Sequence, residues 1–196
     1  MKNILALAFI LIGTQFVSAQ DTTKTTKKQE IIKKADNYTI QRLLVFNDKK
    51  EILLEKGRNG WMTPSIRSNE NQSLKEGLDS LAKVIGITVK FGRLAGVYTY
   101  KFNGLPDHKE VSYRTHYTAK YLGGQLIQPK QPNREYKWFS VKTATDSISN
   151  EALRAETKQI IKFPKSVWGG SFLYSYKDGK LEGMKMTEDF YLLSEK

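Results

Sequence analysis

The chain contains no cysteine and only two histidines among its 196 residues. Without cysteine it can form no disulfide, so its folded part must be stabilised by packing alone. The same absence excludes a lipid-modified cysteine at the N-terminus. Zinc sites are built mainly from cysteine and histidine, so this composition argues against a zinc site as well. We therefore expect a domain without covalent or zinc cross-links.

Long apolar runs are also scarce. One such run, Ile4 to Ile12, follows Lys2 and is followed by the small residues at 17–19. The run is too short to span a bilayer comfortably, and this order of features is typical of a secretory signal peptide. We expect residues 1–19 to be that signal, the mature protein to be secreted or periplasmic, and no membrane span to remain. An uncleaved membrane anchor is the alternative.

Acidic residues are few relative to basic ones. The chain has 32 Lys and Arg against 20 Asp and Glu, which gives a formal net charge of +12. Such a balance attracts anions in general: nucleic acid, polyphosphate, anionic lipid or acidic glycans. Part of the excess falls in residues 20–36, a polar stretch predicted to be a linker. We expect an anionic small molecule as partner rather than nucleic acid; a merely solvated surface is the alternative.

The chain as a whole has 39% hydrophobic and 27% charged residues, and its length and composition fit one globular domain. Its periodicity predicts a hairpin of strands 38–46 and 51–56, and further strands at 111–121 and 135–141. A strand over 88–102 should break at Gly92 or Gly96. We expect helices at 143–148 and 150–162, and a terminal hairpin of strands 172–176 and 181–193.

The strand at 111–121 alternates strictly. Val111, Tyr113 and Tyr117 point one way, whereas Arg114 and His116 point the other. We expect the first face to lie in the core and the second to face water.

The stretch from Trp61 to Ile87 carries the clearest local signals. Ser73, with Glu76 three residues later, forms a capping box that starts a helix. Gly86 is placed to end that helix in a left-handed cap, and Ile87 opens the next apolar run. The apolar stripe of the helix is expected at Leu74, Leu78, Leu81 and Ile85.

In this order of elements the chain resembles the Nudix family, hydrolases of nucleoside diphosphates linked to a further group. The resemblance spans residues 38–147 and includes the Glu135-x-x-Trp138-Phe139 strand. The family box, G-x5-E-x7-R-E-U-x-E-E-x-G-U with U aliphatic, fits residues 65–87 without a gap. The resemblance implies an α/β fold, a Nudix-type α/β/α sandwich with a mixed β-sheet. We expect a Nudix-like domain at 37–150, and a C-terminal helix and β-hairpin at 151–196 packed on the same domain.

The box is degenerate at its chemical positions. Its glycine falls on Ser65, its first glutamate on Asn71, its arginine-glutamate pair on Asp79-Ser80, and its metal-binding glutamate pair on Lys83-Val84. In the family the helix glutamates hold Mg²⁺ against a substrate diphosphate. The resemblance therefore implies the scaffold, while these residues predict no metal ligands and no cofactor. Mg²⁺ would be needed only if the chain is an active hydrolase.

Candidate site residues follow from these patterns. Glu135 matches a position where family members often carry a glutamate that assists catalysis, although a surface pair with Lys137 is the simpler interpretation. Arg114 and His116 share a strand face that could contact an anion; for His116 we favour a structural role. The predicted ligand-binding residues are Arg67, Lys83, Arg114 and His116.

These observations support three hypotheses. The leading one is an exported Nudix-like pseudoenzyme that binds a phosphate-containing or other anionic ligand, with metal-dependent hydrolysis weak or lost. The second is an active Nudix hydrolase that cleaves a nucleoside diphosphate derivative and recruits its acids from elsewhere: Glu70, Glu76, Asp79 or Glu135. The third is a protein-interaction module whose aromatic tail, residues 172–193, pairs with a partner.

Overall fold

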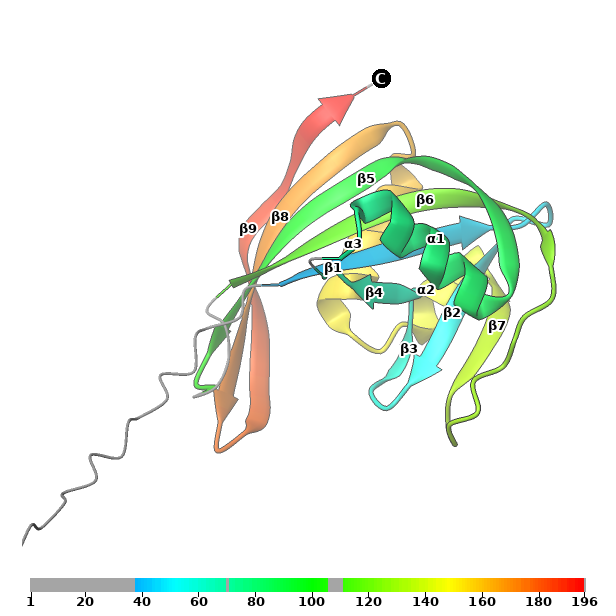
Figure 1. The fold of residues 1–196 in the computed structure, drawn as a ribbon. Coiled ribbons are helices and arrows are strands. Elements are labelled where there is room, and N and C mark those ends of the chain that lie inside the picture. The colour runs from blue at the N-terminus through cyan, green and yellow to red at the C-terminus, as the bar shows by residue number, and fades with distance from the viewer. Residues whose placement is uncertain (1–37, 70, 106–110, 196) are drawn as a thin grey trace, which may run out of the picture. The chain divides into compact units, whose positions relative to one another are not determined.

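The computed structural model describes residues 38–69, 71–105 and 111–195, so the predicted signal peptide and linker lie outside the described residues. The described chain forms one mixed sheet of nine strands, together with three helices (Figure 1). The strands are β1 (Thr39–Phe46), β2 (Glu51–Gly57), β3 (Gly60–Met62), β4 (Ser65–Arg67), β5 (Ile87–Asn103), β6 (Val111–Gly124), β7 (Glu135–Ser140), β8 (Ser166–Lys177) and β9 (Lys180–Glu195). The helices are α1 (Leu74–Ile85), α2 (Val141–Ser147) and α3 (Glu151–Lys162).

The strand order along the sheet is β3-β2-β1-β6-β5-β8-β9, with β4 attached to β1 and β7 to β2. The pairs β1 with β6 and β5 with β8 are parallel, and the other pairs are antiparallel. The terminal hairpin is confirmed, because β8 and β9 pair along their length. Residues 151–195 therefore extend the same sheet through β8.

The predicted hairpin of the first two strands is confirmed only beside its turn, where β1 and β2 pair antiparallel. β1 and β2 share only the register pair Phe46 and Ile52. β1 instead pairs with β6 and β4, and β2 pairs with β3 and β7. Leu43, Leu44 and Val45 are all buried, so both faces of β1 need cover. A strand that is apolar on both faces belongs in the middle of a sheet, and here β6 supplies the second neighbour.

Helices cover both faces of the sheet, as Figure 1 shows. On one face Leu78, Leu81 and Ile85 of α1 pack against Leu43 and Leu53. On the other face α2 and α3 contribute side chains that pack against Leu44, Tyr98 and Phe172: Ala144, Ile148, Ala152, Leu153 and Ile160. The predicted α/β/α sandwich with a mixed sheet is confirmed. No helix in the described part of the chain is long and apolar enough to cross a membrane.

Helix α1 begins and ends as predicted. The backbone N–H of Ser73 donates to Oε2 of Glu76 at 2.8 Å, and the N–H of Glu76 donates to Oγ of Ser73 at 3.3 Å. Gly86 closes the helix with φ of 85°. The expected place of Leu74 in the apolar stripe is wrong, because that side chain is 49% exposed. It stands in the first turn, ahead of the part of the helix that meets the sheet.

The expectation that one face of β6 is wet is also wrong. Ser112, Arg114 and His116 are buried, whereas Tyr113 on the opposite face is 51% exposed. The polar face lies beneath α3, and the buried carboxylate of Glu156 on α3 meets His116 there. The strand break predicted at Gly92 or Gly96 is wrong, because β5 runs without interruption from Ile87 to Asn103. The chain is instead bulged there, with register shifts between Phe91 and Leu94 and between Leu94 and Gly96.

The connection between α2 and α3 is bonded to β3. The N–H of Trp61 donates to Oγ of Ser149, and the N–H of Ser149 donates to the carbonyl of Trp61. Trp61 also forms an isolated bridge with Ile148 and packs edge-on against Phe139. These contacts fasten the second helical layer to the β2–β3 hairpin.

Replacing Gly86 by alanine should destabilise the fold by about 2 kcal/mol or more, because a residue with a Cβ pays that order of cost in the left-handed region. The new Cβ would also lie 2.3 Å from the carbonyl oxygen of Gln125. Gly179→Ala is the matched control, since Gly179 has φ of 73° but nothing within 4 Å of its Cβ position. Urea unfolding should show the larger loss for Gly86→Ala; equal losses would contradict the crowding at Gly86.

Candidate functional site

Three degenerate box positions line one cavity. Ser65, Ser80 and Val84 border a cavity of about 280 Å³. We call it the box cavity; its lining residues are Glu55, Ser65, Ile66, Ser80, Leu81, Val84, Arg134 and Tyr136. The structure thus brings together positions that are up to nineteen residues apart in the sequence.

The two helical positions of the box cavity lie one turn apart on α1. Ser80 and Val84 point the same way because residues four apart share a helix face. Oγ of Ser80 accepts a hydrogen bond from Nε2 of Gln72 at 3.1 Å. Ser65 opens β4 and pairs in register with Arg42 of β1. The central strand and the capped helix therefore fix the positions of both serine hydroxyls.

Glu55 is the carboxylate of the box cavity, and the sequence interpretation missed it. It lies on β2, in register with Tyr136 and Met62, with a side chain only 11% exposed. Its Oε1 is 3.8 Å from Nη2 of Arg134. Burial raises the pKa of Glu55, and the charges of Arg134 and Arg42 offset part of that rise. Its place directly after the apolar residues Ile52, Leu53 and Leu54 was the sequence signal that could have indicated a buried carboxylate.

Arg134 reaches the box cavity from the loop before β7. Two hydrogen bonds hold that loop to the strand: Nε2 of Gln128 donates to the carbonyl of Tyr136, and the N–H of Tyr136 donates to Oε1 of Gln128. The N–H of Ile127 also donates to the carbonyl of Ile85 at the end of α1. The Arg134 side chain stays 46% exposed, so its guanidinium can meet a ligand that enters from solvent.

The structure does not bring the predicted site residues together. Lys83 lines a separate cavity with Asp79 and Gly86, on another side of α1. Glu135 pairs in register with Lys56, and strand alternation turns its side chain away from the face of Tyr136. Arg67 is exposed on β4, with its guanidinium 4.5 Å from the ring centre of Tyr38. Binding or catalytic roles for these residues remain predictions.

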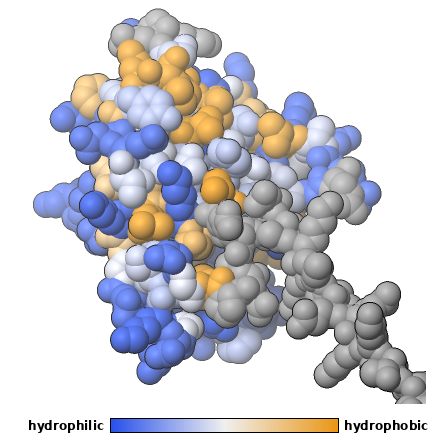
Figure 2. Space-filling view, turned by 90° about the vertical axis from the view of Figure 1, so that its left-hand side faces the viewer, coloured by the Kyte–Doolittle hydropathy of each residue, from blue (hydrophilic) through white to orange (hydrophobic). Residues whose placement is uncertain are grey.

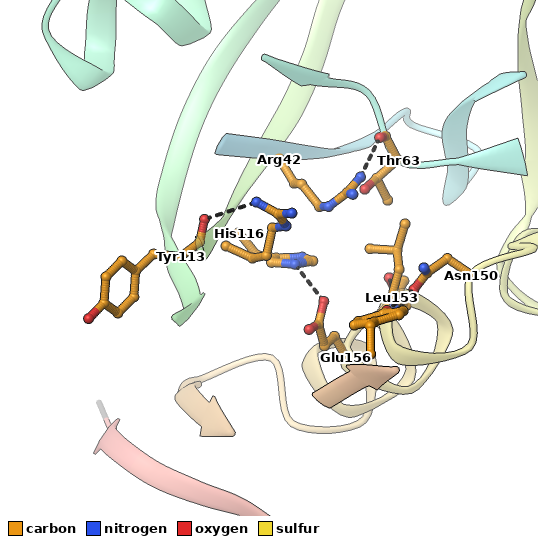
Figure 3. Close-up of polar contacts among 10 residues, drawn as sticks. Arg42, Thr63, Tyr113, His116, Asn150, Leu153 and Glu156 are labelled. Carbon is orange, nitrogen blue, oxygen red and sulfur yellow. Dashed lines mark hydrogen bonds and ion pairs between the residues drawn. The ribbon is translucent and has the colours of Figure 1, made fainter. Parts of the chain in front are cut away.

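Arg114 and His116 lie on the opposite face of the sheet from the box cavity. His116 points toward Glu156 of α3 (Figure 3). Nε2 of His116 is 2.9 Å from Oε2 of Glu156, and both side chains are at most 1% exposed. Nη1 of Arg114 donates to Oγ of Ser112 at 2.5 Å. The Arg114 guanidinium also lies 4.8 Å from the ring centre of Tyr100. This burial supports a structural role for His116.

The charge state of the buried pair follows from its surroundings. Burial lowers the pKa of His116, although the carboxylate of Glu156 acts in the opposite direction. The charges of Arg42 and Arg114 add to the lowering. His116 is therefore held neutral in the folded protein at neutral pH. Glu156 was not foreseen, because nothing in the helix pattern indicates which strand its side chain meets.

The whole chain was compared with known proteins. No protein-family model matches the sequence, and no curated protein matches it. Among solved structures, a MutT protein from Bacillus halodurans matches with a TM-score of 0.58 and 19% identity, over 76% of this chain and 97% of that one. A MutT protein from Methanosarcina mazei matches with a TM-score of 0.55 and 20% identity, over 67% and 98%. A Nudix hydrolase from Nitrosomonas europaea gives 0.55 and 16%, over 72% and 81%.

The chain has the Nudix fold. At these identities the likeness shows the fold alone, so the chemistry must be argued from the residues at the site. The predicted Nudix resemblance is confirmed at this level.

The box cavity of this Nudix fold does not fit Mg²⁺. Mg²⁺ prefers several hard oxygen ligands in an octahedral arrangement. The cavity offers one carboxylate, Glu55, and a guanidinium stands beside it. Asp79 and Glu76 are engaged elsewhere, with Lys75 and in the capping box. The described residues include no group of three or more His, Cys, Asp or Glu that could hold a metal.

Adding carboxylates at the cavity-lining positions should create a divalent-metal site. We expect Ser80→Glu with Val84→Glu to bind Mn²⁺, because three carboxylates would then face one cavity. The matched control is Ser80→Glu with Lys83→Glu, which adds the same number of carboxylates to α1 but places one at the separate cavity. Calorimetric titration with Mn²⁺ should show tighter binding by the first variant, and equal affinities would contradict the placement of Val84.

The neutral state of His116 should make stability depend on pH. In the unfolded chain histidine titrates near its ordinary pKa of about 6.5, whereas burial lowers the pKa in the folded protein. The unfolded state therefore binds the proton first, and stability should fall as the pH drops below that ordinary value. His116→Gln removes the titrating group but keeps a donor for Glu156. Urea unfolding between pH 7.5 and 5 should show a shallower loss for the variant; parallel losses would contradict the lowered pKa.

Proposed function

We propose that this Nudix-fold protein binds a phosphate-bearing anion in the box cavity and does not use a divalent metal to hydrolyse it. The observation that carries this proposal is the composition of the cavity: a guanidinium and two serine hydroxyls line it, and Ser80 and Val84 occupy box positions at which the family carries glutamates. A diphosphate derivative, such as a nucleotide, is the ligand class that the fold favours.

Arg134 supplies the positive charge that a metal would otherwise bring. A guanidinium matches two phosphate oxygens at once, which makes arginine well suited to bind phosphate groups. Its contact with Glu55 is long, at 3.8 Å, so the guanidinium keeps donors for a ligand. Ser65 and Ser80 also line the cavity and can add hydroxyl donors.

Glu55 should make ligand binding in the box cavity depend on pH. In its charged form it would repel a phosphate group in the same cavity, whereas its protonated form would donate a hydrogen bond. Because burial raises the pKa of Glu55, the protonated form persists to higher pH than in an exposed glutamate. We therefore expect the ligand to bind more tightly as the pH falls.

The test is isothermal titration of the purified protein with ADP-ribose and with inorganic pyrophosphate, in EDTA and again in Mg²⁺. We expect binding in EDTA that Mg²⁺ does not strengthen. Arg134→Ala should weaken it at least about tenfold, because a charge-assisted hydrogen bond contributes roughly 1.5–3 kcal/mol. Arg58→Ala is the control, since Arg58 is exposed in the β2–β3 turn.

Two results would count against the proposal. One is release of phosphate or a nucleoside monophosphate that requires Mg²⁺, which would instead support an active hydrolase. The other is equal affinity of Arg134→Ala and the unchanged protein. Glu55→Gln should bind at least as tightly as the unchanged protein and lose most of the pH dependence, which separates the role of the charge from that of the fold.

The other expectations on function stay predictions. Export depends on residues 1–19, which lie outside the described residues. A partner for the C-terminal hairpin would meet β9, the last strand of the sheet, where Leu192 and Leu193 are about half exposed. Figure 2 shows hydrophobic atoms gathered beside the C-terminal end of the chain.

A further inference from the structure

A second cavity lies at the end of the sheet where β1 stops. Its volume is about 420 Å³, and it shares no lining residue with the box cavity. We call it the strand-end cavity; it is lined by Phe46, Asn47, Lys90, Phe91, Gly92, Thr118, Ala119 and Lys120.

A bulge in β5 shapes this cavity. Phe91 pairs with Ala119 and Leu94 pairs with Tyr117, so Gly92 and Arg93 together oppose the single residue Thr118. The N–H of Arg93 donates to Oγ1 of Thr118 at 3.2 Å. A Cβ on Gly92 would lie 2.6 Å from that same oxygen, so the close approach needs glycine. Bulges bend a strand and redirect its side chains.

The walls of the strand-end cavity are largely apolar. Phe46 is partly buried against the cluster beneath α2 and α3, on the same face of the sheet as its register partner Lys120. Phe91 and Ala119 belong to the cluster beneath α1, so their side chains lie on the other face, and the apolar wall on this face is formed by Phe46 and the bulge at Gly92. Such walls suit an apolar body, because contact with them removes apolar surface from water.

The rim of the cavity is positively charged. Lys90 and Lys120 are register partners on neighbouring strands, an arrangement in which like charges repel. Lys120 is paired with Asp48 at 3.0 Å. Lys90 has no ion pair with another residue of the described chain, so its charge is the one left uncompensated.

We propose that the strand-end cavity binds a small amphipathic anion, with its apolar body against Phe46 and the bulge at Gly92 and a carboxylate or sulfonate at Lys90. The apolar walls select the body, and the uncompensated ammonium beside a like charge selects the anionic head. A neutral molecule of the same shape would leave the repulsion between Lys90 and Lys120 in place.

The test uses 8-anilinonaphthalene-1-sulfonate as a fluorescent probe, with decanoate and decanol as competitors. We expect decanoate to displace the probe at a concentration at least about tenfold lower than decanol, since they share a tail and differ in the charged head. Lys90→Glu should abolish that preference and Lys90→Arg should keep it. Lys101→Glu, which changes an exposed lysine on the same strand, should leave it unchanged.

Equal displacement by decanoate and decanol would overturn the proposal, as would a preference that survives Lys90→Glu. Circular dichroism of each variant checks that the fold is intact. If Lys90→Glu unfolds the protein, Lys90→Arg still tests the proposal, because loss of the preference for decanoate in that variant would contradict it. Arg134→Ala should leave decanoate binding unchanged. That result separates this cavity from the box cavity, so the two proposals can fail independently.

Discussion

The burial of both faces of β1 is the constraint on which the rest of the structure depends. Leu43 and Val45 require a layer on one side, and Leu44 requires a layer on the other. Helix α1 provides the first layer, and α2 with α3 provides the second. The same arrangement holds β4, and with it Ser65, against the central strand. The box cavity therefore owes its geometry to packing and not to metal ligands.

The residues that hold α1 in place differ from those at the chemical positions of the box, and this explains how the fold persists although the box is altered. The capping residues and Gly86 fix both ends of α1, while Leu78, Leu81 and Ile85 attach it to the sheet. None of these contacts uses Ser80 or Val84. The scaffold can thus tolerate changes at the metal positions without losing its shape, and the net charge of the cavity can shift from acidic to mixed.

Much of this could be predicted from local patterns. The capping box, the Gly86 stop and the terminal hairpin depend on residues close together in the sequence, and all three are confirmed. The pairing of β1 with β6 could not be predicted, because it joins strands about seventy residues apart. For the same reason the sequence did not reveal Glu55 beside Arg134 or His116 beside Glu156. The alternation of side chains along β6 also led to a wrong prediction of a solvent-exposed face. Its polar residue His116 is buried because α3 brings the carboxylate of Glu156 to it.

The parallel pairing of β5 with β8 has a consequence for the order of folding. β5 is the long strand next to β6, yet its other neighbour lies near the end of the chain. Until β8 is made, β5 is an unprotected sheet edge, and the apolar side chains of Tyr98 and Tyr100 lack the cover that Phe172 and α3 later give. Contacts between distant segments are slow to form. A shortened chain that ends before β8 would therefore present an open, aggregation-prone edge rather than a smaller stable domain.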